Sequence, residues 1–291
     1  MSSSRRATLR RRPFCAEVSR ESGEPLAATA SRVDRWILVE YRGVWAYDAL
    51  EASGLSREVK AHLQERAQAL AASKVLFIRR TERRRDRALV VFWGASAESG
   101  SWLRRDEVEA YDELLGLGFE KNGEPVEHPL LLVCTHGKHD RCCARYGRPL
   151  YEALAEAAEE GWVWQCSHVG GDRFAGNLVI LPEGLYFGRV GHEEAWTVLD
   201  EHLAGRIHMP VYRGRSCYSF PLQAAERAVR ELTGARGLDA VRVSSTEPIR
   251  LEADGRVYEV EVVRESGELT YLTCASETLR HPRRYAAEIL P

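Results

Sequence analysis

The segment between residues 130 and 169 constrains the fold of this chain more than any other part of the sequence. It begins with the apolar run LLLVCT, passes through a polar loop into the helical pattern RPLYEALAEAAEEG, and ends with a second apolar run, VWQCSHV. A strand, a helix and a strand in this order are typical of a unit whose two strands run parallel. The ends of neighbouring parallel strands are adjacent, so Cys134 and His168 are expected to lie within a few ångströms of each other.

The same order of elements occurs in the first half of the chain. The run WILVEY predicts a strand, the apolar spacing over 56–73 predicts a helix, and KVLFIRR and RALVVFWG predict two further strands. A short edge strand, WLRR, and a helix over DEVEAYDELLGLG follow. In the second half, NLVILPEGLYFGRV predicts a hairpin and HEEAWTVLDEHLAG a helix. We infer two tandem thioredoxin-like units.

The predicted secondary-structure pattern changes after residue 205. A helical pattern, QAAERAVRELTG, precedes alternating apolar and polar stretches that contain the hairpin signal ADGR. The predicted fold class is therefore α/β, with two tandem thioredoxin-like units and a small C-terminal antiparallel β appendage. The predicted parts are a basic tail and lead-in (1–29), a first unit without metal ligands (30–125), a second unit with the candidate site (126–205), and a C-terminal helix with antiparallel strands (206–291).

Charge and hydropathy exclude some classes of function. The 43 acidic and 41 basic residues leave a net charge of -2, which gives no overall field to attract nucleic acid or an anionic membrane. No apolar run of about 18 residues is present, so no membrane span is predicted. The start, MSSSRRATLRRRPFC, has no apolar core for secretion, and its arginines match the arginine bias of the whole chain. We predict a soluble, cytoplasmic protein with a basic tail.

Cysteine and histidine gather around one loop. CTHGKHDRCC holds three cysteines and two histidines, and WQCSHVGGDRFAGN adds Cys166 and His168 beside Gly170 and Gly171. Without a secretion signal, these cysteines favour thiol or metal chemistry over a disulfide framework. Thiolates and imidazoles suit iron–sulfur clusters or zinc. The glycine pair is predicted to leave room for a bulky cofactor.

The other cysteines and histidines have simpler interpretations. Cys15, Cys217 and Cys274 are predicted to be structural, as small buried hydrophobic side chains. His136 and His139 are predicted to form hydrogen bonds within the loop rather than to bind a metal.

The motifs of this region resemble those of a known family. CTHGKHDRCC, HVGGDRFAGNLVILPEGLYFGRV and GRSCYSFPLQAAERAVRELTG are similar to the sucrase/ferredoxin-like family, and the resemblance extends over nearly the whole chain. It implies a thioredoxin-like protein that carries a 2Fe-2S cluster. Fungal members are implied to bind the cluster through two cysteines and an H-x-G-G-H segment. The matching positions are Cys134, Cys143, His168 and, in place of the second histidine, Asp172.

The fourth ligand is open among three residues. Asp172 keeps the family's interval from His168, although a carboxylate is a harder ligand than a thiolate or an imidazole. Cys142 is softer, but it would have to share the site with its neighbour Cys143. Cys166 shares a strand face with His168 yet lies deeper in the sheet. We favour Asp172 over Cys142.

Three functions follow from these residues. The first is a soluble 2Fe-2S protein with mixed Cys/His ligation that passes single electrons to an unidentified redox partner protein. The second is a thiol-based redox enzyme that uses Cys134 as nucleophile and Cys142 or Cys143 as resolving thiol. The third is a zinc-stabilised binding module. We favour the electron carrier, and we expect no metal in residues 30–120, which contain no cysteine.

Overall fold

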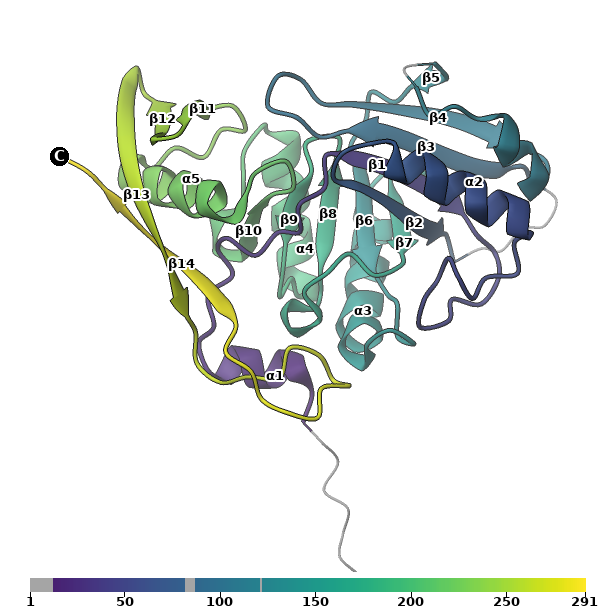
Figure 1. Cartoon of the computed structure of the whole chain (residues 1–291), viewed down its shortest axis with the longest axis horizontal. Helices are drawn as coiled ribbons and strands as arrows, with labels where there is room; N and C mark the ends of the chain where they lie inside the picture. The colour runs from purple at the N-terminus through teal and green to yellow at the C-terminus, as the bar shows by residue number, and fades with distance from the viewer. Residues whose placement is uncertain (1–12, 82–86, 121) are drawn as a thin grey trace, which may run out of the picture.

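The structure is a computed structural model that describes residues 13–81, 87–120 and 122–291. The fold is mixed α/β, with a large curled sheet of ten strands and a separate antiparallel sheet of four strands. Figure 1 shows the helices α2, α3 and α4 against the large sheet and the helix α5 beside the small one. Residues 1–12 of the predicted basic tail and lead-in (1–29) lie outside the described residues. No helix among the described residues is long and apolar enough to cross a membrane.

The first half of the large sheet is built around one parallel pair. Its elements are β1 (Arg35–Glu40), α2 (Arg57–Gln68), β2 (Ser73–Arg79), β3 (Leu89–Ala95), β4 (Trp102–Val108) and β5 (Glu124–Pro125). The strand β1 runs parallel to β2 and antiparallel to β3, and β4 pairs with β3. Helix α2 begins after Ser56, whose hydroxyl accepts a hydrogen bond from the N–H of Val59.

The second half repeats this pairing. Its elements are β6 (Leu130–Cys134), α3 (Arg141–Ala157), β7 (Val163–Cys166), β8 (Leu178–Leu181), β9 (Leu185–Phe187), α4 (His192–Leu203) and β10 (Tyr212–Arg215). The strand β6 runs parallel to β7 and antiparallel to β8, and β9 pairs with β8. The halves join where β2 pairs antiparallel with β7. The description of each half as a thioredoxin-like unit stays a prediction.

One core is shared by the two halves. Trp36 and Leu38 of β1, Leu132 of β6 and Trp164 of β7 belong to a single buried cluster on the inner face of the curled sheet. Alternate residues along the strands point to the outer face. There Ile37 packs in a cluster with residues of α2. Val133 packs in a second cluster with residues of α3 and α4. Because the inner core crosses the predicted boundary at 125/126, neither half is expected to fold alone.

The C-terminal part contains the predicted small antiparallel sheet. Its elements are α5 (Phe220–Thr233), β11 (Val241–Thr246), β12 (Ile249–Ala253), β13 (Arg256–Ser266) and β14 (Arg283–Ile289). The strand β10, placed by the sequence in this part, belongs to the large sheet instead, where it pairs with β9. The loop 267–282 between β13 and β14 reaches back to α1 (Cys15–Glu21), a helix that the sequence analysis did not predict.

Two helix predictions differ from the structure. The predicted helix over 106–118 is replaced by the continuation of β4 to Val108 and a 3-10 helix at Tyr111–Gly116, because β4 keeps its pairing with β3 up to Leu89. Helix α3 begins at Arg141, ahead of the predicted start at residue 148. Asp140 accepts the N–H of Cys142 at 2.7 Å, and this N-cap starts the helix although Pro149 lies inside it.

A buried ion cluster attaches α5 to the large sheet. Glu226 is fully buried and accepts hydrogen bonds from Arg230 on its own helix at 3.0 Å and from Arg215 of β10 at 3.4 Å. Its second oxygen accepts the hydroxyl of Tyr212 at 3.0 Å. The positive charges of two buried guanidinium groups are therefore compensated by one carboxylate.

We expect Glu226→Ala to lower the free energy of unfolding by about 3–5 kcal/mol, because it leaves two guanidinium groups buried without their partner. The matched control is Glu231→Ala on the same helix, which breaks the exposed pair with Arg227 and is expected to cost about 0.5 kcal/mol or less. Urea unfolding curves measure both. Equal losses of unfolding free energy in the two variants would show that the buried ion cluster contributes no more to stability than the exposed ion pair.

Candidate metal centre

The parallel pair β6–β7 positions the candidate ligands. Cys134 is the last residue of β6, its backbone partner on β7 is Cys166, and His168 follows two residues later. Cys143 lies in the first turn of α3. Asp172 opens the short 3-10 helix at Asp172–Phe174. Four side chains from separate elements thus converge at the end of the inner core.

The distances between these side chains are short. Nδ1 of His168 lies 4.0 Å from Sγ of Cys134 and 3.9 Å from Sγ of Cys143. Oδ1 of Asp172 lies 3.1 Å from the same Nδ1 and 3.7 Å from Sγ of Cys143. The expected proximity of Cys134 and His168 is confirmed. Nδ1 of His168 thus lies close to both sulfurs and to one carboxylate oxygen.

Close packing holds α3 against the strand that carries Cys134. Gly147 faces the end of β6, and a Cβ at this position would collide with the carbonyl oxygen of Cys134. Only a glycine allows the helix to approach this closely. The distance between Cys143 and Cys134 therefore depends on a residue that touches neither sulfur.

A loop of the first half covers the site. His136 donates its Nε2–H to the carbonyl of Ala46 at 2.6 Å, and His139 donates its Nδ1–H to the carbonyl of Tyr47 at 3.2 Å. Since a carbonyl only accepts, Nε2 of a neutral His139 keeps a free lone pair. Metal-binding histidines commonly donate their other N–H in this way. His139, interpreted from the sequence as a hydrogen-bonding residue, becomes a candidate ligand.

Aromatic rings connect the site with the surface. The ring of His139 stacks on that of His168 with centroids 3.8 Å apart and an interplanar angle of 16°. The ring of Tyr47 also stacks on that of His139, with centroids 4.7 Å apart. The side chain of Tyr47 is largely exposed. The side chain of His168 is itself 19% exposed, so the ligand groups lie close to solvent.

The pKa shifts of Cys134 and His139 favour metal binding. The hydrogen bond from Cys143 holds the pKa of Cys134 well below its usual range, with a further contribution from His168, and the same bond raises the pKa of Cys143. Burial raises the pKa of Asp172 to about 6 and lowers the pKa of His139. Metals bind thiolates and neutral imidazoles, so the lowered pKa values of Cys134 and His139 both favour the form that binds a metal.

The glycine pair has a packing role that the sequence analysis did not foresee. Gly170 and Gly171 have φ values of 102° and 83°, a region that favours glycine. A Cβ on Gly170 would collide with Ser31, and a Cβ on Gly171 with the buried guanidinium of Arg213. Ser31 and Arg213 therefore fill the space where these Cβ atoms would lie, and the role of the pair in binding a cofactor stays a prediction.

The two alternative ligands lie elsewhere. Cys142 does not join Cys134 and Cys143, because successive residues of a helix point in different directions and its side chain faces α1. Cys166 is buried in the inner core beside β6, where burial raises the pKa of its thiol, and it belongs to no group of candidate ligands among the described residues.

Cys142 forms part of a second group. Cys15, Asp140, Cys142 and Cys274 place their ligand atoms within 4.8 Å of one another, and we call them the three-cysteine group. The sequence analysis treated Cys15 and Cys274 as structural. No spacing rule could have found this group, since its members come from the two ends and the middle of the chain.

The sequence profile of the family described as sucrase/ferredoxin-like matches residues 26–214, more than half of the chain. This chain belongs to the sucrase/ferredoxin-like family. The match covers β1 through most of β10 and includes all four residues of the candidate metal centre. The recognition made from the motifs is thereby confirmed.

Curated relatives match a part of this sucrase/ferredoxin-like chain. "Altered inheritance of mitochondria protein 32" of Meyerozyma guilliermondii is 30% identical over 120 residues, which are 38% of this chain and 43% of the relative. The protein of the same name from Debaryomyces hansenii is 30% identical over 101 residues, 31% of this chain and 37% of the relative. The chain spans less than half the length of these relatives. The predicted cytoplasmic location stays a prediction.

Solved structures also resemble part of the chain. The wild-type thioredoxin-like [2Fe-2S] ferredoxin from Aquifex aeolicus is 18% identical and covers 31% of this chain and 100% of its own, with a TM-score of 0.28. Its Cys55Ser variant is 17% identical and covers 30% of this chain and 100% of its own, with the same TM-score. With a TM-score and sequence identity this low, these structures support no conclusion about the candidate metal centre.

We expect Gly147→Ala to lower the free energy of unfolding by about 1–3 kcal/mol, because the new methyl group forces α3 away from β6. An unhindered Gly-to-Ala change in a helix would instead stabilise by roughly 0.5–1 kcal/mol, so the sign of the effect is informative. Gly116→Ala is the control, since a Cβ there meets nothing within 4 Å. Urea unfolding measures both. A stabilised Gly147→Ala variant would contradict the tight contact with Cys134.

Proposed function

We propose that the protein carries one electron at a time on a 2Fe-2S cluster held by Cys134, Cys143, His168 and Asp172. The observation that carries the proposal is the convergence of both sulfurs on Nδ1 of His168 at 4.0 and 3.9 Å. Membership of the sucrase/ferredoxin-like family supports it. A bound 2Fe-2S cluster supplies a centre that gains and loses a single electron, at a potential set by its ligands.

The donor set fits such a cluster. Two thiols side by side suit one iron, and an imidazole with a neighbouring carboxylate suits the other. Asp172 is the proposed fourth ligand because its Oδ1 faces both Nδ1 of His168 and Sγ of Cys143. His139 is the alternative, since one of its ring nitrogens lies within 4.8 Å of ligand atoms of His168 and Asp172.

Burial argues against the thiol-enzyme alternative. Cys134 is 1% exposed and Cys143 is 0% exposed, so a protein disulfide or a peroxide has no open approach to either sulfur. Its other proposed resolving thiol, Cys142, faces a different group of side chains. Electron transfer needs no such approach, because the rings of His139 and Tyr47 connect His168 with the surface. The redox partner itself stays a prediction.

The protein purified without oxygen, or reconstituted with iron and sulfide, is expected to be red-brown. It should hold about two irons and two sulfides per chain and give a rhombic S = 1/2 EPR signal after one-electron reduction. Cys143→Ser should lose iron, sulfide and signal, whereas Cys217→Ser, a half-buried cysteine outside both groups, should keep all three. A wild-type protein that binds zinc at this site and no iron after reconstitution would favour the zinc module instead.

A second experiment identifies the fourth ligand. Asp172→Ala should make the cluster labile, and Asp172→His should keep it and raise its potential, because an imidazole removes negative charge from the iron. The wild-type potential should lie below the range of about -150 to +300 mV known for Rieske centres, which have two histidines. Asp200→Ala, an exposed aspartate on α4, is the control.

Potential and cluster lifetime measure these variants. If Asp172→Ala leaves both unchanged while His139→Ala releases the cluster, then His139 is the fourth ligand and the assignment of Asp172 is wrong.

A further inference from the structure

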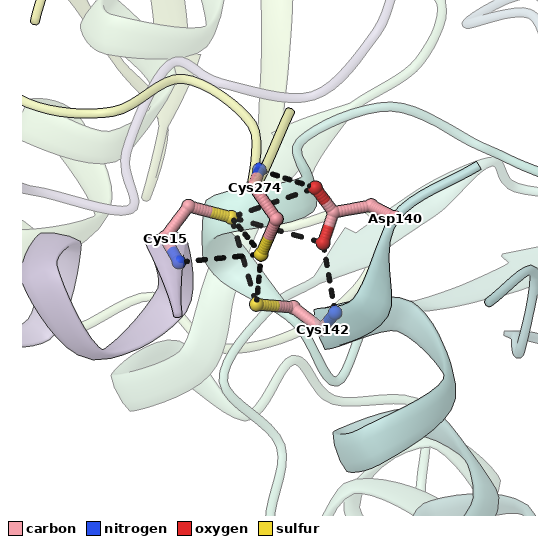
Figure 2. A group of neighbouring side chains, drawn as sticks. All are labelled: Cys15, Asp140, Cys142 and Cys274. Atoms are coloured by element: carbon pink, nitrogen blue, oxygen red, sulfur yellow. Dashed lines mark hydrogen bonds between the residues drawn. The ribbon is translucent and has the colours of Figure 1, made fainter. Parts of the chain in front are cut away.

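The three-cysteine group lies where α1 and the loop 267–282 meet the start of α3 (Figure 2). Its three sulfurs form a nearly equilateral triangle: Cys15 to Cys142 is 3.5 Å, Cys142 to Cys274 is 3.3 Å, and Cys274 to Cys15 is 3.6 Å. The Asp140 carboxylate lies 3.8 and 3.9 Å from Sγ of Cys15. Figure 2 shows the four side chains pointing toward one another.

We propose that this group is a second metal site, which holds one zinc ion through Cys15, Cys142 and Cys274, with a carboxylate oxygen of Asp140 as the fourth ligand. Zinc in structural sites is tetrahedral, with thiolate sulfurs at about 2.3 Å and carboxylate oxygens at about 2.0–2.2 Å. An ion placed above the sulfur triangle can reach all three sulfurs at that distance without a change in the backbone.

The triangle does not suit the other fates of three thiols. A disulfide joins only two sulfurs at about 2.05 Å, so it would leave the third thiol of this set unpaired. A [4Fe-4S] cluster binds one thiolate on each iron and so holds its thiolates farther apart than one shared ion does, and a 2Fe-2S cluster places at most two thiolates on one iron. Equal spacing of three thiolates fits a single soft ion, and zinc is among the metals that thiolate ligands bind in tetrahedral sites.

The fourth ligand is already oriented. The two oxygens of Asp140 accept the backbone N–H of Cys142 at 2.7 Å and of Cys274 at 2.6 Å. Such hydrogen bonds to a ligating carboxylate are common around bound metals, and each oxygen keeps a lone pair. The position of Cys142 in the first turn of the 17-residue helix α3 adds the positive end of the helix dipole, which stabilises the negative charge of the ligands.

The site explains how the loop 267–282 is held. This loop has only an isolated bridge between Thr270 and Arg280 as regular pairing, and loops of such length in compact proteins usually have a function or an attachment. Its Cys274 packs with Cys15 of α1 and Cys142 of α3 in one small buried cluster. A zinc ion would fasten the lead-in helix, the C-terminal loop and α3 at one point.

The second site is separate from the first. Cys142 and Cys143 are neighbours, but Cys142 faces Cys15 and Cys274, whereas Cys143 faces His168 and Asp172. The inference therefore does not rest on the proposed electron carrier. Iron and zinc are measured independently in the same sample, so the failure of either proposal leaves the other standing.

The test uses the full chain from cells supplied with both iron and zinc. Elemental analysis should find about one zinc per chain, and X-ray absorption at the zinc edge should find three sulfurs at about 2.3 Å and one oxygen at about 2.0–2.2 Å. Cys274→Ser should lose the zinc and keep the iron and the EPR signal, and trypsin should then cleave faster near Arg280. Cys217→Ser should keep both metals.

Several results would overturn the inference. They are a wild-type chain without zinc whose cysteines are linked in a disulfide, zinc that remains in Cys274→Ser, a zinc shell without sulfur, or iron lost from Cys274→Ser in place of zinc. The X-ray absorption spectrum of the wild-type protein tests the zinc site even if the variant fails to fold.

Discussion

The parallel pairing of β6 with β7 determines where the candidate metal centre lies. It places Cys134 opposite Cys166 in the sheet and brings the chain that follows β7 to the end of β6. His168 and Asp172 can then face Cys134 although more than thirty residues separate them in sequence. The N-cap by Asp140 supplies the remaining side, because it starts α3 early enough to bring Cys143 into the same space.

The two halves of the large sheet depend on each other. Their inner faces pack into one core, and β2 continues the sheet from β7. The first half also supplies the loop whose carbonyls orient His136 and His139. It was expected to carry no metal, and its visible contribution is to cover and orient the ligands of the other half.

Asp140 connects the two groups of ligands. It caps α3, and its carboxylate holds the backbone of Cys142 and Cys274. Because consecutive helical residues are rotated by about 100°, the adjacent cysteines at the start of α3 serve different groups.

The sequence by itself determined most of the order of strands and helices in the large sheet, the parallel pair in the second half, and the types of side chain at its edge. These follow from local periodicity and from the rule that parallel strands end at one edge. Only the tertiary structure separated Cys142 from Cys143, brought Cys15 and Cys274 together, and placed His139 on His168. The reason is physical. Periodicity reports which face of an element is buried, whereas contacts between distant segments depend on how those faces pack. Helix α3 begins seven residues before its predicted start, and this earlier start places Cys142 and Cys143 in different surroundings.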